Sequence, residues 1–126
     1  MPARGRCSRI SAGGRCPHWQ HTSITVTPEG KVKVKVKNLL NAYGAYHFWP
    51  VQTGMGARTL DCLGCHNGRA FSIETKAPGK KMTEQQRAIA DRMEYSRCKV
   101  FEISSPDELL ELEHWLRAIP QISLFV

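Results

Sequence analysis

Asp61, Glu74 and Lys76 are the residues whose types and spacing could carry out metal-ion chemistry. Carboxylates are hard oxygen ligands of the kind that hold Mg²⁺ or Mn²⁺. Such an ion can polarise a phosphodiester oxygen and lower the pKa of a bound water, while a nearby lysine can position that water or stabilise charge on the phosphate. The same residues could instead form a surface cluster of ordinary cross-strand ion pairs, so their placement decides between the two interpretations.

A hairpin is predicted to bring the two carboxylates together. Asn67-Gly68 is the strongest short hairpin signal, and a two-residue type I′ turn at this pair places Asp61 directly opposite Glu74. Facing residues of an antiparallel ladder project to the same side with Cβ atoms about 4.5 to 5.5 Å apart, so either a cation lies between the two carboxylates or this register is wrong. Because side chains alternate along a strand, Lys76 shares their face, while the opposite face takes Phe71, Ile73 and Thr75.

The first strand of this hairpin also contains Cys62-Leu-Gly-Cys65-His66, which matches the C-x-x-C-H pattern of haem attachment. The hairpin register places Cys62 and Cys65 on opposite faces of one strand, with Cys62 opposite Ile73 and Cys65 beside Ala70. Two thiols that point apart cannot readily bind one metal or one haem. We expect both cysteines to be small hydrophobic residues of the hairpin, and a Cys/His metal or haem module is the less favoured alternative.

The segment before the hairpin is predicted to be a helix. Its alternating lysines and valines read at first as a strand, but Thr27 as N-cap, Pro28 as first helical residue and Gly44 as C′ residue indicate a helix over 27–44. Glu29 falls inside the apolar arc of this helix and either complements the helix dipole or serves a site. The arc itself is formed by Val32, Val36, Leu39, Leu40 and Tyr43.

The remaining elements follow from turn signals, β propensity and capping boxes. Beyond the hairpin we expect a strand over 45–51, a glycine-rich loop over 52–59, a helix from Thr83 to about Arg97, a strand over 98–103 and a helix from Ser105 to about Ala118. Thr83 with Gln86, and Ser105 with Glu108, would form the two capping boxes. The order αβββαβα predicts an α/β (α+β) fold with a mixed sheet flanked by helices.

Composition limits the classes of protein that this chain can represent. The 126 residues carry a formal net charge of +7, which favours a polyanionic partner, and no apolar run is long enough to span a membrane. Residues 1–22 are expected to form a disordered basic arm, and residues 23–126 a single domain. The arm contains Cys7, Cys16, His18 and His21, but their spacing fits no common zinc site. We expect a cytoplasmic protein with reduced cysteines.

The pattern around the hairpin resembles the PD-(D/E)xK nuclease motif: Asp61, a gap of twelve residues, then Glu74-Thr75-Lys76. The surrounding sequence, over roughly residues 27 to 119, is similar to the virus-type replication-repair (VRR-NUC) branch of this family, in particular to its small phage members. It is carried by Gly54-Met-Gly-Ala-Arg58, Gly68-Arg-Ala-Phe-Ser-Ile-Glu-Thr-Lys-Ala-Pro-Gly79 and Thr83-Glu-Gln-Gln86. The resemblance implies a restriction-endonuclease-like αβββαβ core followed by a C-terminal helix.

The resemblance also implies roles for single residues. Asp61, Glu74 and the backbone carbonyl of Thr75 would bind Mg²⁺ or Mn²⁺, and Lys76 would be the catalytic lysine. Glu29 matches the glutamate of the first helix of the family, and Gln86 matches the glutamine of the helix after the hairpin. Leu60 departs from the motif because it stands where a proline usually lies, but that position contributes no ligand.

A nuclease must bring a polyanion to carboxylates, so basic side chains are expected around the site. The expected function is a metal-dependent DNA endonuclease acting in phage or mobile-element replication, repair or recombination, in a bacterial or phage-infected cell. A homodimer is a further expectation for such an enzyme, and the competing interpretation is a catalytically silent nucleic-acid-binding domain on the same fold. The candidates for phosphate binding are Lys33, Arg58, Arg69, Lys80, Lys81 and Arg87.

Overall fold

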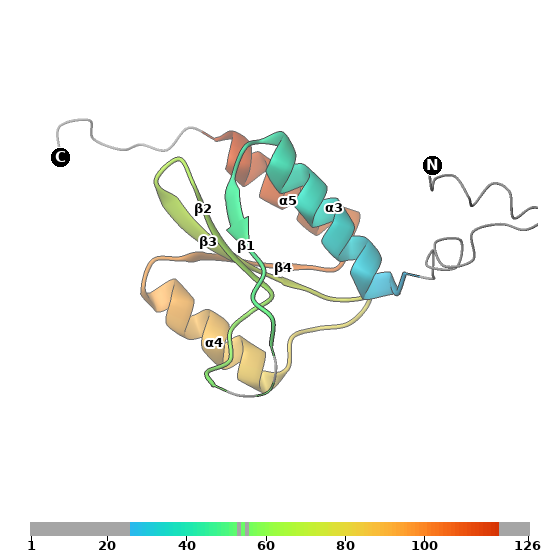
Figure 1. Ribbon diagram of the computed structural model, residues 1–126, viewed down its shortest axis with the longest axis vertical. Coiled ribbons are helices and arrows are strands. Elements are labelled where there is room, and N and C mark those ends of the chain that lie inside the picture. The colour runs from blue at the N-terminus through green and yellow to red at the C-terminus, as the bar shows by residue number, and fades with distance from the viewer. Residues whose placement is uncertain (1–25, 53, 55, 119–126) are drawn as a thin grey trace, which may run out of the picture.

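The computed structural model describes residues 26–52, 54 and 56–118, so the predicted basic arm over 1–22 and its cysteines lie outside the described residues. The described chain is an α+β structure with a four-stranded sheet in the order β1-β2-β3-β4. Its elements, labelled as in Figure 1, are α3 (Pro28–Ala42), β1 (Tyr46–Phe48), β2 (Cys62–His66), β3 (Arg69–Thr75), α4 (Glu84–Tyr95), β4 (Lys99–Ile103) and α5 (Pro106–Arg117). The predicted element order is confirmed.

The sheet is mixed, as predicted. β1 pairs with β2 and β2 with β3 in antiparallel orientation, whereas β3 pairs with β4 in parallel. Asn67 and Gly68 have φ angles of 52° and 78°, which are the positive values that a type I′ turn requires at both central residues. The resulting register aligns Cys62 with Ile73 and His66 with Arg69. The local turn signal was therefore sufficient to predict the pairing of these two strands.

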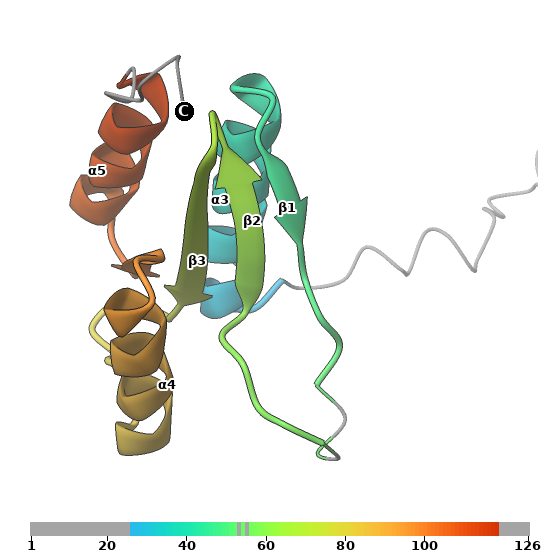
Figure 2. The same cartoon turned by 90° about the vertical axis from the view of Figure 1, so that its left-hand side faces the viewer.

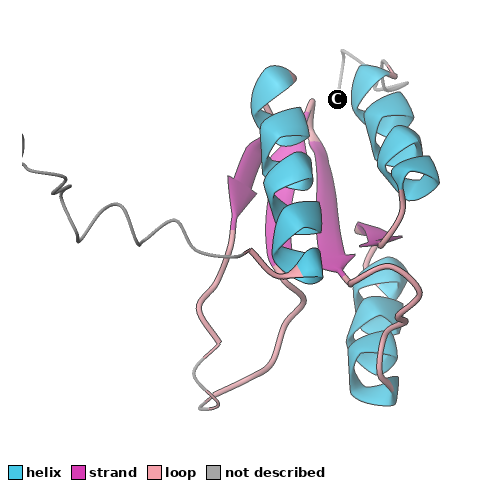
Figure 3. Ribbon diagram, turned by 90° about the vertical axis from the view of Figure 1, so that its right-hand side faces the viewer, coloured by secondary structure: helices cyan, strands magenta, loops and turns pink. Residues whose placement is uncertain are grey.

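Helices cover both faces of the sheet. α3 and α5 lie on one face and α4 lies on the other (Figure 1). Figure 2 shows β1 at one edge of the sheet, and Figure 3 shows α3 crossing in front of the strands from the opposite side. The main core fills the space between the sheet and the α3–α5 layer, and it contains Val36, Leu40, Ala45, Cys62, Phe71, Ile73, Phe101, Ile103, Leu112 and Leu116.

The Lys/Val segment forms a helix because both of its ends are capped and only one of its faces is apolar. The Thr27 side chain accepts a hydrogen bond from the backbone N–H of Gly30 at 3.0 Å, and Gly44 adopts a φ of +70° after the last turn. Val36 is fully buried, whereas Val34 remains half exposed, as its place outside the apolar arc predicted. Lys31, Lys35 and Lys37 are exposed, whereas Val36 lies in the core and Val32 packs against it.

The strand at the sheet edge is shorter than expected. A strand over 45–51 was predicted, but β1 contains only Tyr46–Phe48, because Pro50 cannot donate a ladder hydrogen bond. The close pairing of β1 with β2 requires a glycine at position 64. A Cβ atom there would overlap the carbonyl oxygen of Tyr46 and the ring of Phe71.

The two later helices begin as their caps predicted, with one difference. Thr83 and Gln86 form a complete capping box at the start of α4. At α5 the Ser105 side chain accepts from the N–H of Glu108, but the Glu108 carboxylate reaches Ser104 instead of Ser105. The predicted second capping box is therefore only half formed. Within the described residues no helix is both long and apolar enough to span a membrane.

Candidate active site

The two acidic residues singled out by their spacing meet at one end of the hairpin. Asp61 lies directly before β2, and Glu74 lies near the end of β3. The backbone N–H of Asp61 donates to Glu74 Oε1 at 3.2 Å. In return, the N–H and the hydroxyl of Thr75 donate to Asp61 Oδ2 at 3.0 and 2.8 Å. Glu74 Oε1 is therefore held by the backbone of Asp61, and Asp61 Oδ2 is held by Thr75. These hydrogen bonds fix the positions of both carboxylates.

The side chain of Asp61 does not follow the strict alternation of the strands. Thr75 was predicted on the face opposite Asp61, yet the Thr75 hydroxyl binds the Asp61 carboxylate. The reason is that the ladder begins only at Cys62, so the residue before it is free to turn toward the end of β3. The prediction that Asp61 and Glu74 lie close together holds, but the expected division of faces at this end is wrong.

Glu74 is surrounded by polar partners although it is almost fully buried. Its side chain is 3% exposed, and its Oε2 atom lies 3.3 Å from Lys76 Nζ. The same oxygen accepts a hydrogen bond of 2.8 Å from Gln86 Nε2. Because the other end of the Gln86 amide accepts from Thr83 N in the capping box, the start of α4 holds Glu74 in place. Gln86 thus combines a structural role with a place in the site.

The first turn of α3 adds a third acid and a second lysine. Lys33 Nζ lies 3.8 Å from Glu29 Oε2 and 3.9 Å from Asp61 Oδ1. Glu29 is half exposed and faces this cluster rather than the core. Lys33 was expected to bind DNA, but it lies between two carboxylates of the site. In this position a single ammonium group partly neutralises Glu29 and Asp61.

The environment of Glu74 disfavours its ionised form. The pKa of Glu74 is raised from 4.5 to about 7, chiefly by burial and also by the neighbouring Asp61 carboxylate, against the opposing effects of Lys76 and of the Asp61 N–H. A nearby cation will stabilise the ionised form of a carboxyl group that its surroundings otherwise keep protonated. The site is therefore suited to attract a positive ion.

A hard divalent ion fits this donor set. Mg²⁺ is commonly held by one or two carboxylates together with waters and a substrate phosphate, and Asp61 and Glu74 supply two carboxylates whose positions are fixed. Among the described residues no three His, Cys, Asp or Glu side chains form a complete cage, which such an ion does not require. The residues thus fit a site that is completed by water and substrate.

The two cysteines of β2 take no part in the site. Cys62 is fully buried and Cys65 is exposed on the other face of β2, so they cannot bind one ion or one haem edge together. Burial raises the pKa of the Cys62 thiol to about 12, which keeps it protonated and unsuited to bind metal. His66 instead contacts the backbone carbonyl of Leu116 at 3.1 Å.

Four of the other basic candidates are exposed and belong to segments that precede or follow the acidic residues in the chain. Arg58 is exposed in the loop before Asp61, and Lys80 and Lys81 are exposed in the loop after Lys76. Arg87 lies in the first turns of α4, where its guanidinium pairs with Glu102 at 3.2 Å and with Asp91 at 4.0 Å.

Arg69 is not brought to the site. It lies at the turn end of β3, five residues from Glu74, which at roughly 3.3 Å per residue separates them by about 17 Å. Its guanidinium stacks on the Trp115 ring at 4.0 Å and donates to the carbonyls of Trp115 and Ala118 at 2.9 and 3.2 Å. In this structure Arg69 fastens the end of α5 to the hairpin.

Sequence reasoning missed two contacts, one within the site and one beside it. The contact of Lys33 with Glu29 has a local signal, because residues four apart on a helix are neighbours, but its contact with Asp61 has none. Glu102 lies beside Glu74 in the parallel β3–β4 register and accepts from the N–H of Met82 at 2.6 Å. No local sequence pattern indicates which residue of β4 faces Glu74.

Compared with known proteins, the chain matches no family model and no curated sequence. Two fixed carboxylates, a third acid, two lysines and an amide lie at one end of the sheet. This set can bind a hard cation and, with the surrounding basic side chains, a phosphate group.

Proposed function

We propose that this chain is a metal-dependent DNA endonuclease with a PD-(D/E)xK core of the VRR-NUC type. The observation that carries the proposal is the mutual fixing of Asp61 and Glu74 beside Lys76, with Oε2 of Glu74 held by Gln86. An ordinary surface cluster of ion pairs does not explain why Glu74 is buried. Burying a carboxylate costs free energy, and that cost is offset when the group serves to bind a cation.

Mg²⁺ or Mn²⁺ would be held by Asp61, by Glu74 and by the backbone carbonyl of Thr75. The ion would supply polarisation of a phosphodiester oxygen and activation of the attacking water. Glu29 would stabilise the ion or its waters from α3, because it already faces the same cluster through Lys33.

The remaining residues would orient the groups that react. Lys76 Nζ lies against Glu74, where its positive charge can stabilise negative charge that develops on the phosphate. Gln86 keeps Glu74 in one orientation through its hydrogen bond to Oε2. Arg58 is exposed in the loop before Asp61, and Lys80 and Lys81 are exposed in the loop after Lys76. These side chains would contact neighbouring phosphates, which makes binding dependent on salt concentration.

The proposal is tested by incubating the purified chain with supercoiled plasmid in the presence of Mg²⁺, Mn²⁺ or EDTA. We expect nicked and linear products with at least one of the two metals and none with EDTA. A panel of linear, nicked, flapped and four-way DNA would then identify the preferred substrate. If neither metal supports cleavage of any of these substrates while the chain still binds DNA, the protein is a silent nucleic-acid-binding domain and the proposed activity is wrong.

Lys33→Met is expected to tighten the binding of Mn²⁺ about 3- to 5-fold. The wild-type ammonium competes with the ion for Glu29 and Asp61, and a partly exposed pair of this kind contributes up to about 1 kcal/mol. The affinity can be measured by isothermal titration calorimetry on the protein without DNA. Lys31→Met is the matched control, because it removes the same charge from the same helix at a residue that forms no ion pair within the described chain. Equal affinities for wild type and Lys33→Met would show that Lys33 does not compete with the ion.

A further inference from the structure

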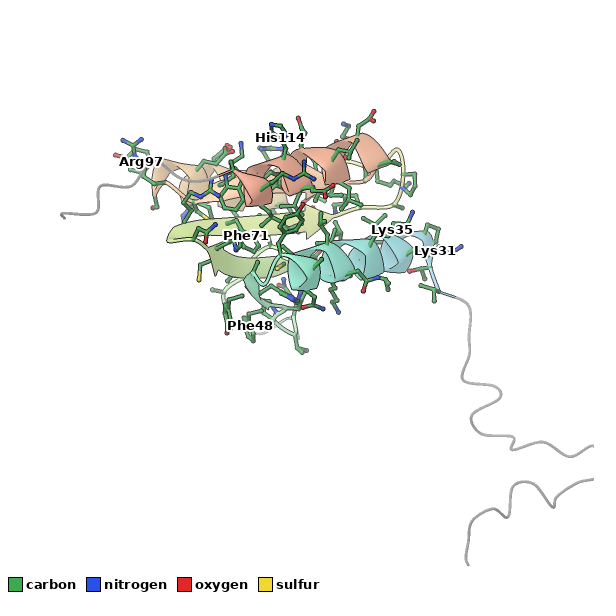
Figure 4. All side chains as sticks on the ribbon, turned by 90° about the horizontal axis from the view of Figure 1, so that it is seen from above. Lys31, Lys35, Phe48, Phe71, Arg97 and His114 are labelled. Carbon is green, nitrogen blue, oxygen red and sulfur yellow. The ribbon has the colours of Figure 1, made fainter. Side chains whose placement is uncertain are left out.

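A cavity of about 350 Å³ lies between the start of α3, the loop after β3 and the start of α5. Its walls are mostly apolar and are formed by Pro28, Val32, Pro78, Ile103, Pro106 and Leu109. Lys31 and Lys35 also line it, and Figure 4 shows both at the N-terminal half of α3, on the side that faces α5. None of these residues belongs to the acidic cluster described above.

The cavity is adjacent to the candidate active site. The backbone N–H of Lys76 donates to the carbonyl oxygen of Ile103 at 2.9 Å, and Ile103 forms part of the cavity wall. Pro78, two residues after Lys76, forms another part. On α3 the cavity residues Val32 and Lys31 are neighbours of Lys33 in the same turn. A DNA strand that has one phosphate at Lys76 and runs toward the start of α3 would therefore pass the mouth of this cavity.

The charge at the rim of the cavity is available to a ligand. Within the part of the chain that the structure describes, neither Lys31 nor Lys35 pairs with a carboxylate. This differs from Lys33, Lys76 and Arg87, each of which has an acidic partner. Two unpaired ammonium groups beside an apolar cavity favour a ligand that is flat and apolar in one part and anionic in another.

The hydroxyl groups in the wall are already engaged. Ser104 Oγ donates to Glu108 Oε1 at 3.0 Å, and Ser105 Oγ accepts from Glu108 N at 3.4 Å. Both hydroxyl oxygens thus have a partner in Glu108 at the start of α5. A ligand would be held mainly by its apolar faces and its charge.

We propose that this cavity binds one unpaired nucleotide of the DNA strand next to the scissile phosphate. The base occupies the apolar space among the three prolines, and Lys31 and Lys35 contact the flanking phosphates. The proposal rests on the proposed nuclease function and adds to it a subsite outside the acidic cluster, which takes one unpaired base beside the cleavage site. An acidic peptide with an apolar side chain is the competing occupant.

The test measures binding by fluorescence anisotropy in EDTA, where no metal-dependent cleavage occurs. Labelled duplex is compared with the same duplex carrying a short single-stranded extension of mixed sequence. We expect wild type to bind the extended DNA more tightly than the duplex. The double variant Lys31→Gln, Lys35→Gln should lose most of this difference, and its slope of log K against log salt on extended DNA should fall by about 1.4, since each contact to a single-strand phosphate contributes about 0.7.

Two further variants separate the cavity from general charge. Leu109→Trp fills the cavity without changing charge and should also remove the preference for extended DNA, provided that thermal unfolding shows an intact fold. Lys37→Gln with Arg92→Gln removes two exposed charges outside the cavity and should weaken both DNAs equally. The subsite does not exist if the Lys31→Gln, Lys35→Gln variant loses affinity for both DNAs equally. It also does not exist if wild type shows no preference for the extended DNA. The same conclusion follows if an acidic apolar peptide binds the cavity and the extension does not compete with it.

The binding and cleavage measurements test the subsite and the proposed nuclease activity separately. A chain that cuts plasmid with Mn²⁺ but shows no preference for the extension keeps the proposed function and loses this subsite. If the chain shows the cavity-dependent preference in EDTA but cleaves no DNA with either metal, the subsite is supported and the proposed nuclease activity is wrong.

Discussion

Asp61→Asn and Glu74→Gln are each expected to reduce the rate of DNA cleavage by at least about 100-fold at a fixed metal concentration. Removing one preorganised charged group from an active site commonly has an effect of this size. Both substitutions keep the shape of the side chain, and the amide oxygen introduced by Asp61→Asn can still accept hydrogen bonds from Thr75. The fold should therefore survive, and circular dichroism and thermal unfolding would check that it does.

Glu102→Gln is the matched control for these two variants. Glu102 lies directly beside Glu74 in the β3–β4 register, but its carboxylate binds Met82 N and Arg87 and not the acidic cluster. Cleavage by this variant should stay within a few-fold of wild type. If Asp61→Asn or Glu74→Gln cleaved DNA at the wild-type rate, the assignment of the site would be wrong.

The roles of the acids and of Lys76 can be separated by measuring metal affinity and rate together. The Asp61 and Glu74 variants should bind Mn²⁺ more weakly, because they lose a ligand. Lys76→Gln should bind Mn²⁺ at least as well as wild type and still cleave slowly at saturating metal, because the group that stabilises the phosphate is missing. An increase of metal concentration should therefore partly restore the acid variants and not Lys76→Gln.

The second large effect is a loss of stability of the metal-free protein as the pH rises. The pKa of Glu74 is raised by burial to about 7 in the folded chain, from 4.5. Below about pH 4.5 the carboxyl is protonated in both the folded and the unfolded chain, and it contributes no pH dependence. Between that value and about pH 7 the unfolded chain releases the proton first, so the free energy of unfolding falls as the pH rises. The full change is on the order of 3 kcal/mol for this one group.

Urea unfolding in EDTA at about pH 5 and about pH 8 measures this effect. Wild type should lose more stability between these two values than Glu74→Gln, which cannot ionise at this position. Glu111→Gln, an exposed carboxylate on α5, is the control and should behave like wild type. Mn²⁺ should stabilise wild type more strongly at the higher pH, where Glu74 binds it in ionised form. Identical pH dependence in wild type and Glu74→Gln would contradict the assigned burial of a protonatable carboxyl.

The sequence alone was sufficient for features that depend on neighbouring residues. The Asn67-Gly68 turn determined the β2–β3 register, because two positive φ angles allow only one way to reverse the chain. Thr27 and Thr83 determined where α3 and α4 begin, because a side-chain oxygen satisfies the free backbone N–H groups at each start. Through the register, these local signals also placed Asp61 beside Glu74, which is the central pair of the site.

Only the tertiary structure decided which partners the long basic side chains adopt. Lys33 and Arg69 look alike in the sequence as basic residues near the motif, yet one lies between Glu29 and Asp61 and the other stacks on Trp115. The difference arises from how α3 and α5 pack on the sheet. The raised pKa of Glu74 depends in the same way on the burial that the surrounding sheet and α4 produce. Contacts between elements distant in the chain have no local sequence signal, so packing alone determines them.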